Sequence, residues 1–125
     1  DMSEEALDAA VAETQKLLGA IIQKPKLTDA LLKKPPFRFL HDIISEVNRV
    51  KGFPGGSVLT DFDMDSNNFK DKDSKVAYLN KVITAVAAAT GPLSVKPLKV
   101  VAGLEPEHTN AFLTALARAC SSSAP

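Results

Sequence analysis

Residues 33–44 read Lys-Lys-Pro-Pro-Phe-Arg-Phe-Leu-His-Asp-Ile-Ile, and this stretch decides the fold. The residue before a proline avoids the α conformation, so Pro35-Pro36 ends one helix. Pro36 can then occupy the first turn of the next helix, where its missing N–H is not needed. Two phenylalanines and three aliphatic residues predict a buried face, and three cations predict a solvated one. The stretch therefore predicts a helix junction beside a basic surface.

Hydrophobic spacing predicts helices on both sides of this junction. We expect four longer helices at residues 3–23, 37–51, 73–90 and 106–120, and two short ones at 27–34 and 96–102. In the longer helices apolar residues recur at spacings of three and four, as on the buried face of an amphipathic helix. No strand pattern of convincing length is present. The sequence predicts an all-α protein, with a single compact helical domain at residues 3–120 and the start of a flexible linker at 121–125.

Turn and capping residues predict where these helices end. Ser3 is suited to cap the first helix, and Pro25 is expected to end it. Residues 52–71 are rich in Gly, Asp and Asn, which predicts a long loop with one short turn. Asp71 or Asp73 can cap the helix that follows.

In the helix at 37–51, one face of the wheel carries five aliphatic side chains. We expect these to point inward: Leu40, Ile43, Ile44, Val47 and Val50. In the last helix, Phe112, Leu113, Leu116 and Cys120 form the corresponding stripe. These two faces are the main predicted contributions to the core.

Composition limits the class of protein. With 125 residues and 45% hydrophobic content, the chain is long enough for one globular domain. The single Cys120 excludes an internal disulfide, fits a reducing compartment and is expected to act as a small core residue. No apolar run reaches about 18 residues, so no membrane span is predicted.

Charge is balanced overall but separated along the chain. Fifteen basic residues match fifteen acidic ones. Residues 24–38 hold five bases and one acid, whereas residues 1–13 hold five acids and no base. A neutral chain with its charges separated in this way can still present a basic face.

The acidic repeat at residues 61–67 partly matches a calcium-binding loop. Its alternating carboxylates match the start of an EF-hand loop, but Ser66 stands where glycine is needed and Lys72 where a bidentate glutamate is needed. A solvated acidic loop is the preferred interpretation.

No residues match a catalytic or metal-binding pattern. His41 and His108 have no cysteine or second histidine at ligand spacing, and His41, beside Asp42 in a helix, is expected at the surface or its boundary. The glycines at 52–56 lack the Gly-Lys-Ser/Thr ending of a phosphate loop. We therefore expect no enzymatic activity, no cofactor and no metal, and we favour a binding module.

The clustered cations are the candidate binding residues. Lysines and one arginine near the two helix junctions raise the local potential, and others can join them if the second half folds against the first. The candidates are Lys33, Lys34, Arg38, Lys24, Lys26, Lys70, Lys72, Lys75, Lys96 and Lys99. An ordinary solvated face is the alternative. Nucleic acid is disfavoured, because net charge is zero and few exposed aromatics are evident for stacking.

Several sequence blocks, in order, resemble a known family. They lie at residues 27–44, 52–53, 70–75, 96–97 and 101–110. Together they resemble the N-terminal calponin-homology-like domain of an intraflagellar-transport complex B subunit, the microtubule-interacting protein associated with a TNF-receptor-associated factor. The resemblance covers about residues 7–120.

This resemblance implies a divergent calponin-homology fold that binds tubulin or microtubules. It implies a cilium or flagellum and its basal body, on the cytoplasmic side, as the location. Other complex B subunits are expected to bind mainly through regions outside this chain, and the isolated domain is expected to be a monomer. The family pattern marks as typical Lys34, Arg38, Lys70, Lys72, Lys75 and Lys96.

Tubulin carries acidic surfaces and flexible acidic C-terminal tails, so the family and the basic residues point to the same partner. Lys33, Lys34 and Arg38 are the leading contact candidates. A structural domain that docks other transport subunits through an apolar patch is the main alternative. Actin binding, by analogy with tandem calponin-homology proteins, is a weaker one.

Overall fold

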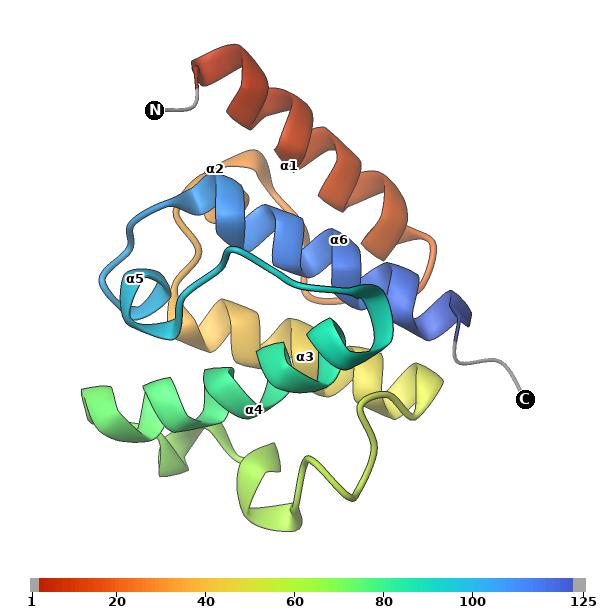
Figure 1. Ribbon diagram of the computed structural model, residues 1–125, viewed down its shortest axis with the longest axis vertical. Helices are drawn as coiled ribbons and strands as arrows, with labels where there is room; N and C mark the ends of the chain where they lie inside the picture. Colours follow the sequence, from red (N-terminus) through yellow and green to blue (C-terminus); the bar gives the residue numbers. More distant parts are fainter. Residues whose placement is uncertain (1–2, 123–125) are drawn as a thin grey trace.

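Helices from opposite ends of the chain lie side by side in the computed structural model, which describes residues 3–122 (Figure 1). The elements in order are α1 (Glu4–Gly19), α2 (Asp29–Lys33), α3 (Phe37–Lys51), the 3₁₀ turns η1 (Asp61–Met64) and η2 (Ser66–Asn68), α4 (Lys72–Thr90), α5 (Pro97–Val101) and α6 (Pro106–Ser122). The described residues contain no strand, and the predicted all-α class and single compact domain are confirmed. None of the helices in this part of the chain is long and apolar enough to cross a membrane.

Helix α6 is the centre of the packing. It contacts α1, α2 and α4, with α3 and α4 below it in the view of Figure 1. Phe112, Leu113 and Leu116 of α6 are buried, as predicted. Each such side chain contributes roughly 1.5–3 kcal/mol through removal of apolar surface from water. The predicted inward position of Cys120 is also confirmed.

Helix α3 turns its predicted face into the same core. Leu40, Ile43, Ile44 and Val47 are fully buried. Val50 was expected with them and is 42% exposed, so that prediction is wrong. It lies in the last turn of α3 between two exposed basic residues, Arg49 and Lys51.

A buried amide holds the first, second and last helices together. The Thr14 hydroxyl of α1 donates to Asn110 Oδ1 at 2.8 Å. Asn110 Nδ2 donates to the carbonyl of Leu32 at 2.8 Å and to that of Pro106 at 3.0 Å. Because every polar atom of the buried Asn110 side chain is used, the end of α2 is fixed on α6 just before the double proline.

The double proline separates α2 from α3, as predicted, but Pro36 lies one helix position earlier than expected. Pro36 has φ −71° and ψ 156°, so it is the extended N-cap residue of α3 and not part of the first turn. Helix α3 therefore begins at Phe37, as predicted, and ends at Lys51 before the left-handed Gly52. Helix α2 begins after Thr28, whose hydroxyl caps the N–H of Leu31.

The first helix is shorter than expected. Ser3 caps it as predicted, but α1 ends at Gly19, well before Pro25. The N–H groups of Ile21 and Ile22 both donate to the carbonyl of Leu18, which makes a turn instead of another helical turn. Ile22 still reaches the core. The spacing of apolar residues therefore predicted that Ile22 is buried, but not that its backbone lies outside the helix.

The long loop contains more local structure than predicted. Two 3₁₀ turns, η1 and η2, form where one short turn was expected. Of the two possible caps for α4, Asp71 is used, and its carboxylate accepts from the N–H of Ser74. At the other end of the chain α6 continues to Ser122, so the linker predicted at 121–125 does not begin at residue 121. The rest of that prediction, residues 123–125, lies outside the described residues.

Candidate functional site

The buried position of His41 is a correction to the sequence analysis. The ring Nε2 lies 2.7 Å from the backbone carbonyl oxygen of Asp63. A carbonyl can only accept, so Nε2 donates, and Nδ1, 3.5 Å from the Ser45 hydroxyl, is free to accept from it. The reason for the error is that residues 52–71 fold back over this side of α3 and remove His41 from water.

An aromatic cluster surrounds this histidine. The His41 ring lies 5.1 Å from Tyr78, 5.8 Å from Phe69 and 6.1 Å from Phe37, between ring centroids. The Tyr78 hydroxyl is buried, and burial raises the pKa of this phenol. The cluster joins α3 and α4 to Phe69, the residue that follows η2.

Asp63 anchors the acidic loop from inside. Its carboxylate accepts hydrogen bonds from the N–H of Thr60 at 2.8 Å, from the Thr60 hydroxyl at 3.0 Å and from the Lys81 ammonium. Burial opposes ionisation, but these three donors outweigh it and lower the pKa of the Asp63 carboxyl. The Asp63 carboxylate, at the centre of the acidic repeat, therefore stabilises the folded loop through these hydrogen bonds. Within residues 3–122 no group of three or more metal-ligating side chains is placed to hold an ion.

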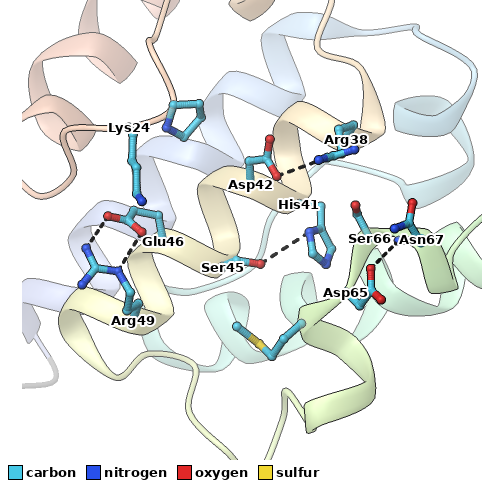
Figure 2. Close-up of a pocket in the computed structure, with 12 residues that line it drawn as sticks. Lys24, Arg38, His41, Asp42, Ser45, Glu46, Arg49, Asp65, Ser66 and Asn67 are labelled. Carbon is cyan, nitrogen blue, oxygen red and sulfur yellow. Dashed lines mark hydrogen bonds and ion pairs between the residues drawn. The ribbon is translucent and has the colours of Figure 1, made fainter.

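A cleft of about 600 Å³ lies beside α3, and Figure 2 shows its lining. Its charged residues are mostly paired within the cleft. Arg49 donates to Glu46 from Nε at 2.9 Å and from a terminal nitrogen at 2.6 Å, and these hydrogen bonds lower the pKa of the Glu46 carboxyl. Arg38 lies 3.4 Å from Asp42. Three bases and three acids line this cleft, so its charge is balanced.

Two smaller hollows on the adjoining surface have a different charge. The first, of about 460 Å³, has Phe37 and Phe69 as its apolar floor, and we call it the Phe69 hollow. It is lined by Pro36, Phe37, Arg38, Ser66, Asn67, Phe69, Lys70 and Lys75. Three of these residues are basic and none is acidic.

The second hollow, of about 380 Å³, lies between the double proline and α5, and we call it the Gly103 hollow. It is lined by Lys34, Pro35, Pro36, Phe37, Val100, Val101, Ala102 and Gly103. A Cβ at Gly103 would lie 3.1 Å from Lys34 Cε, so the lysine stem runs over this glycine. Lys34 is the one charged residue of this lining.

The two hollows share Pro36 and Phe37 and therefore adjoin. We call them together the Pro36 surface. Its cations come from segments far apart in the sequence, and they are Lys34, Arg38, Lys70 and Lys75. Lys34 and Lys70 are exposed and make no ion pair within the described part of the chain. The Lys75 ammonium lies 5.7 Å from the Phe37 centroid, in a cation–π contact.

The other candidate cations lie apart from this surface or beside it. The Lys33 ammonium is 2.9 Å from Asp8 of α1, and this hydrogen bond raises the pKa of Lys33. Lys33 and Lys34, adjacent in sequence, therefore reach different neighbours. Lys24 lines the charge-balanced cleft.

The four remaining candidates are on exposed positions. Lys26 lies on the α1–α2 connection and Lys72 at the first residue of α4, outside both hollow linings. Lys96 is the N-cap residue of α5 and Lys99 lies within α5. Since α5 is a five-residue helix, about 7 Å long, both lie close to the Gly103 hollow that it lines.

Sequence reasoning missed the apolar part of this surface. Phe37 was assigned to the core and is only half-buried, and Phe69 was not considered. Each phenylalanine precedes a base, in Phe37-Arg38 and Phe69-Lys70, at the edge of a helix or turn. That pairing was the available signal, but it does not reveal that both rings line one hollow.

Residues 10–122 match the family model described as "Microtubule-binding protein MIP-T3 CH-like domain". The chain belongs to this family. The resemblance seen in the sequence blocks is thereby confirmed, including the calponin-homology-like fold class.

Curated relatives of this MIP-T3 CH-like domain carry the name TRAF3-interacting protein 1. Those of Rattus norvegicus and Mus musculus are each 50% identical over 113 residues, which cover 90% of this chain. That of Danio rerio is 50% identical over 114 residues, also 90% of the chain. The matched region spans only 17–18% of the length of these relatives.

Proposed function

We propose that this domain binds tubulin or microtubules, and that the Pro36 surface is where acidic tubulin surface or tails make contact. One observation carries the proposal: two adjoining hollows are lined by four cations and by no acidic residue. The family description, which names a microtubule-binding protein, supports the choice of partner.

The chemistry of the surface fits a flexible acidic partner. Ammonium groups on exposed stems attract carboxylates without fixed geometry, which produces weak contacts that salt screens over about 8–10 Å. Several such contacts made together also speed the encounter. We therefore expect modest affinity that falls steeply with ionic strength.

The same proposal includes the role of this domain within a larger transport protein. In an intraflagellar-transport complex B subunit, the domain would act as an adaptor that carries or senses tubulin in the cilium or flagellum. Contacts with other subunits would be made mainly outside this chain. Neither nucleic acid nor a cofactor is part of the proposal, and the isolated domain is expected to be a monomer.

A docking role is the second candidate, and one observation favours it. Leu98 of α5 is 58% exposed and Leu104, shortly after α5, is 51% exposed. Exposed leucines this close together can form an apolar contact for another subunit. Leu98→Ser with Leu104→Ser would abolish such docking and leave tubulin binding unchanged.

Binding of this domain to soluble tubulin, at low and at physiological salt, tests the proposal. The assay is repeated with tubulin whose acidic tails have been removed by protease. Binding that weakens with salt and with tail removal supports a tail contact, and binding that survives tail removal moves the contact to the folded tubulin surface. Absence of binding at low salt, both to soluble tubulin and to microtubules, contradicts the proposal and leaves the docking role.

A further inference from the structure

The Phe69 hollow can recognise a partner both by charge and by aromatic contact, because cations and aromatic rings line it together. Its apolar lining includes the half-buried Phe37 and the buried Phe69, whose ring centroids lie 5.9 Å apart at an angle of 51°. Pro36 extends this apolar lining. A purely electrostatic contact needs only the cations around it, so the rings are an additional feature.

The rim of the hollow is polar and largely unused by the fold. Lys70 makes no ion pair, and the side chains of Ser66 and Asn67 make no hydrogen bond, among residues 3–122. Lys75 is held over the Phe37 ring at 5.7 Å. Arg38 lies 3.4 Å from Asp42. Besides the hydrogen bonds from Ser74, the nearby Lys75 ammonium lowers the pKa of the Asp71 carboxyl.

The volume and shape indicate the size of the ligand group. The hollow, at about 460 Å³, lies within the roughly 300–1,000 Å³ range of small-ligand pockets. It is therefore large enough for a single aromatic side chain but not for a folded element. Aromatic rings pack on other rings in tilted or offset arrangements at centroid distances of roughly 4.5–7 Å.

From these observations we infer that the Phe69 hollow takes one aromatic side chain of an acidic peptide segment, with flanking carboxylates held by Lys70, Lys75 and Arg38. The inference rests on the proposed function, because it specifies which acidic sequences the Pro36 surface prefers. An acidic segment without an aromatic residue still binds through charge but leaves the apolar floor exposed. The aromatic residue would fix which part of the flexible acidic peptide lies at the hollow, whereas charge alone would let the peptide slide.

Two synthetic acidic peptides of equal length and net charge test the inference. One carries a tyrosine between glutamates, and the other carries alanine in its place. By fluorescence anisotropy at low salt, the tyrosine peptide is expected to bind about three- to ten-fold more tightly, in line with one aromatic contact. NMR on the same complex is expected to show contacts between the tyrosine ring and the rings of Phe37 and Phe69.

Variants locate the effect. Phe37→Leu keeps apolar bulk but removes one ring of the floor, and it should lower the preference for tyrosine while leaving the alanine peptide's affinity unchanged. Phe53→Leu is the matched control, because Phe53 is half-buried like Phe37 and lies outside the hollow lining. Thermal unfolding of both variants checks that the fold is intact.

The outcomes separate the two proposals. If neither peptide binds at low salt, the electrostatic contact itself is contradicted, and the inference falls with it. If both bind equally, only the aromatic inference is overturned. If tyrosine is preferred but Phe37→Leu leaves the preference unchanged and no contact to Phe37 or Phe69 is seen, the Phe69 hollow is not the site and the inference is overturned.

Discussion

The ammonium of Lys75 lies 5.7 Å from the centroid of the Phe37 ring. Phe37 begins α3, and Lys75 lies in the first turn of α4, so two helices that are separate in sequence meet at this contact. The contact holds a charge at the edge of the Phe69 hollow without neutralising it. The aromatic ring does not neutralise the ammonium, although Lys75 also lies near Asp71. Besides the hydrogen bonds from Ser74, this ammonium lowers the pKa of the Asp71 carboxyl.

Replacing Lys75 by methionine tests the role of this charge. Lys75→Met keeps the apolar stem over Phe37, so the free energy of unfolding should change by less than about 1 kcal/mol. Tubulin affinity at low salt should fall several-fold, because one of the four cations is lost. Lys72→Met is the control, since Lys72 lies in the same turn but outside the hollow lining. Equal losses of affinity in the two variants would contradict a localised contact.

Removal of the His41 imidazole tests the corrected position of that residue. His41→Leu leaves the Asp63 carbonyl without its donor, and a buried polar group that loses its partner costs about 1–3 kcal/mol. Urea unfolding measures this loss. The matched change His108→Leu, at a half-exposed position, should alter stability by about 0.5 kcal/mol or less. Similar values for both histidines would contradict the buried hydrogen bond.

The lowered pKa of the Asp63 carboxyl makes the stability of the domain depend on pH. The pKa of Asp63 is lowered in the folded protein, so its stabilising contribution is complete above the unfolded value, about 4, and is lost as pH falls through the lower folded value. Asp63→Asn should destabilise the domain by about 1–3 kcal/mol at neutral pH, since Lys81 and Thr60 lose a charged acceptor.

The difference between the Asp63→Asn variant and the parent should shrink as pH drops below about 4. Asp61→Asn is the control, because Asp61 is exposed and its side chain makes no hydrogen bond among the described residues. Urea unfolding across this pH range measures both. A difference that stays constant down to the lowest pH would show that the carboxylate charge is not the stabilising feature.

Gly103 lies under the Lys34 stem in a left-handed conformation, with φ +74°. Gly103→Ala should cost about 1 kcal/mol of stability from the backbone alone. The new Cβ would also push the Lys34 tip away, because their separation would be 3.1 Å. Gly56→Ala, which has nothing within 4 Å and no positive φ, should be neutral or slightly stabilising. Thermal unfolding of the two variants compares them directly.

The regular parts of the fold were readable from the sequence because local rules determine them. Apolar spacing and the double proline predicted α3 at its observed bounds, and Asp71 was one of the two caps proposed for α4. The turn at Ile21 and Ile22 was missed, because the same apolar period continues through it. Periodicity reports which residues are buried more directly than it reports backbone conformation.

The candidate site was only partly readable. The basic residues near the double proline were identified, but Lys33 reaches Asp8 while Lys34 reaches Gly103, and sequence adjacency cannot distinguish these directions. His41 was expected at the surface or its boundary, and its burial could not be predicted because burial by a loop follows no sequence period. Likewise, the meeting of Phe37 with Phe69 depends on how that loop returns to α3.

The central claim is that the cations of the Pro36 surface bind tubulin, and a comparison of two charge-reversed proteins tests it most directly. The first carries glutamate at Lys34, Lys70 and Lys75, and the second at the exposed Lys16, Lys26 and Lys51, which line none of the three hollows described. Both have the same change in net charge. Affinity for soluble tubulin at low salt should fall by more than about ten-fold in the first and change little in the second. An unchanged affinity in the first protein, or equal losses in both, would contradict the account.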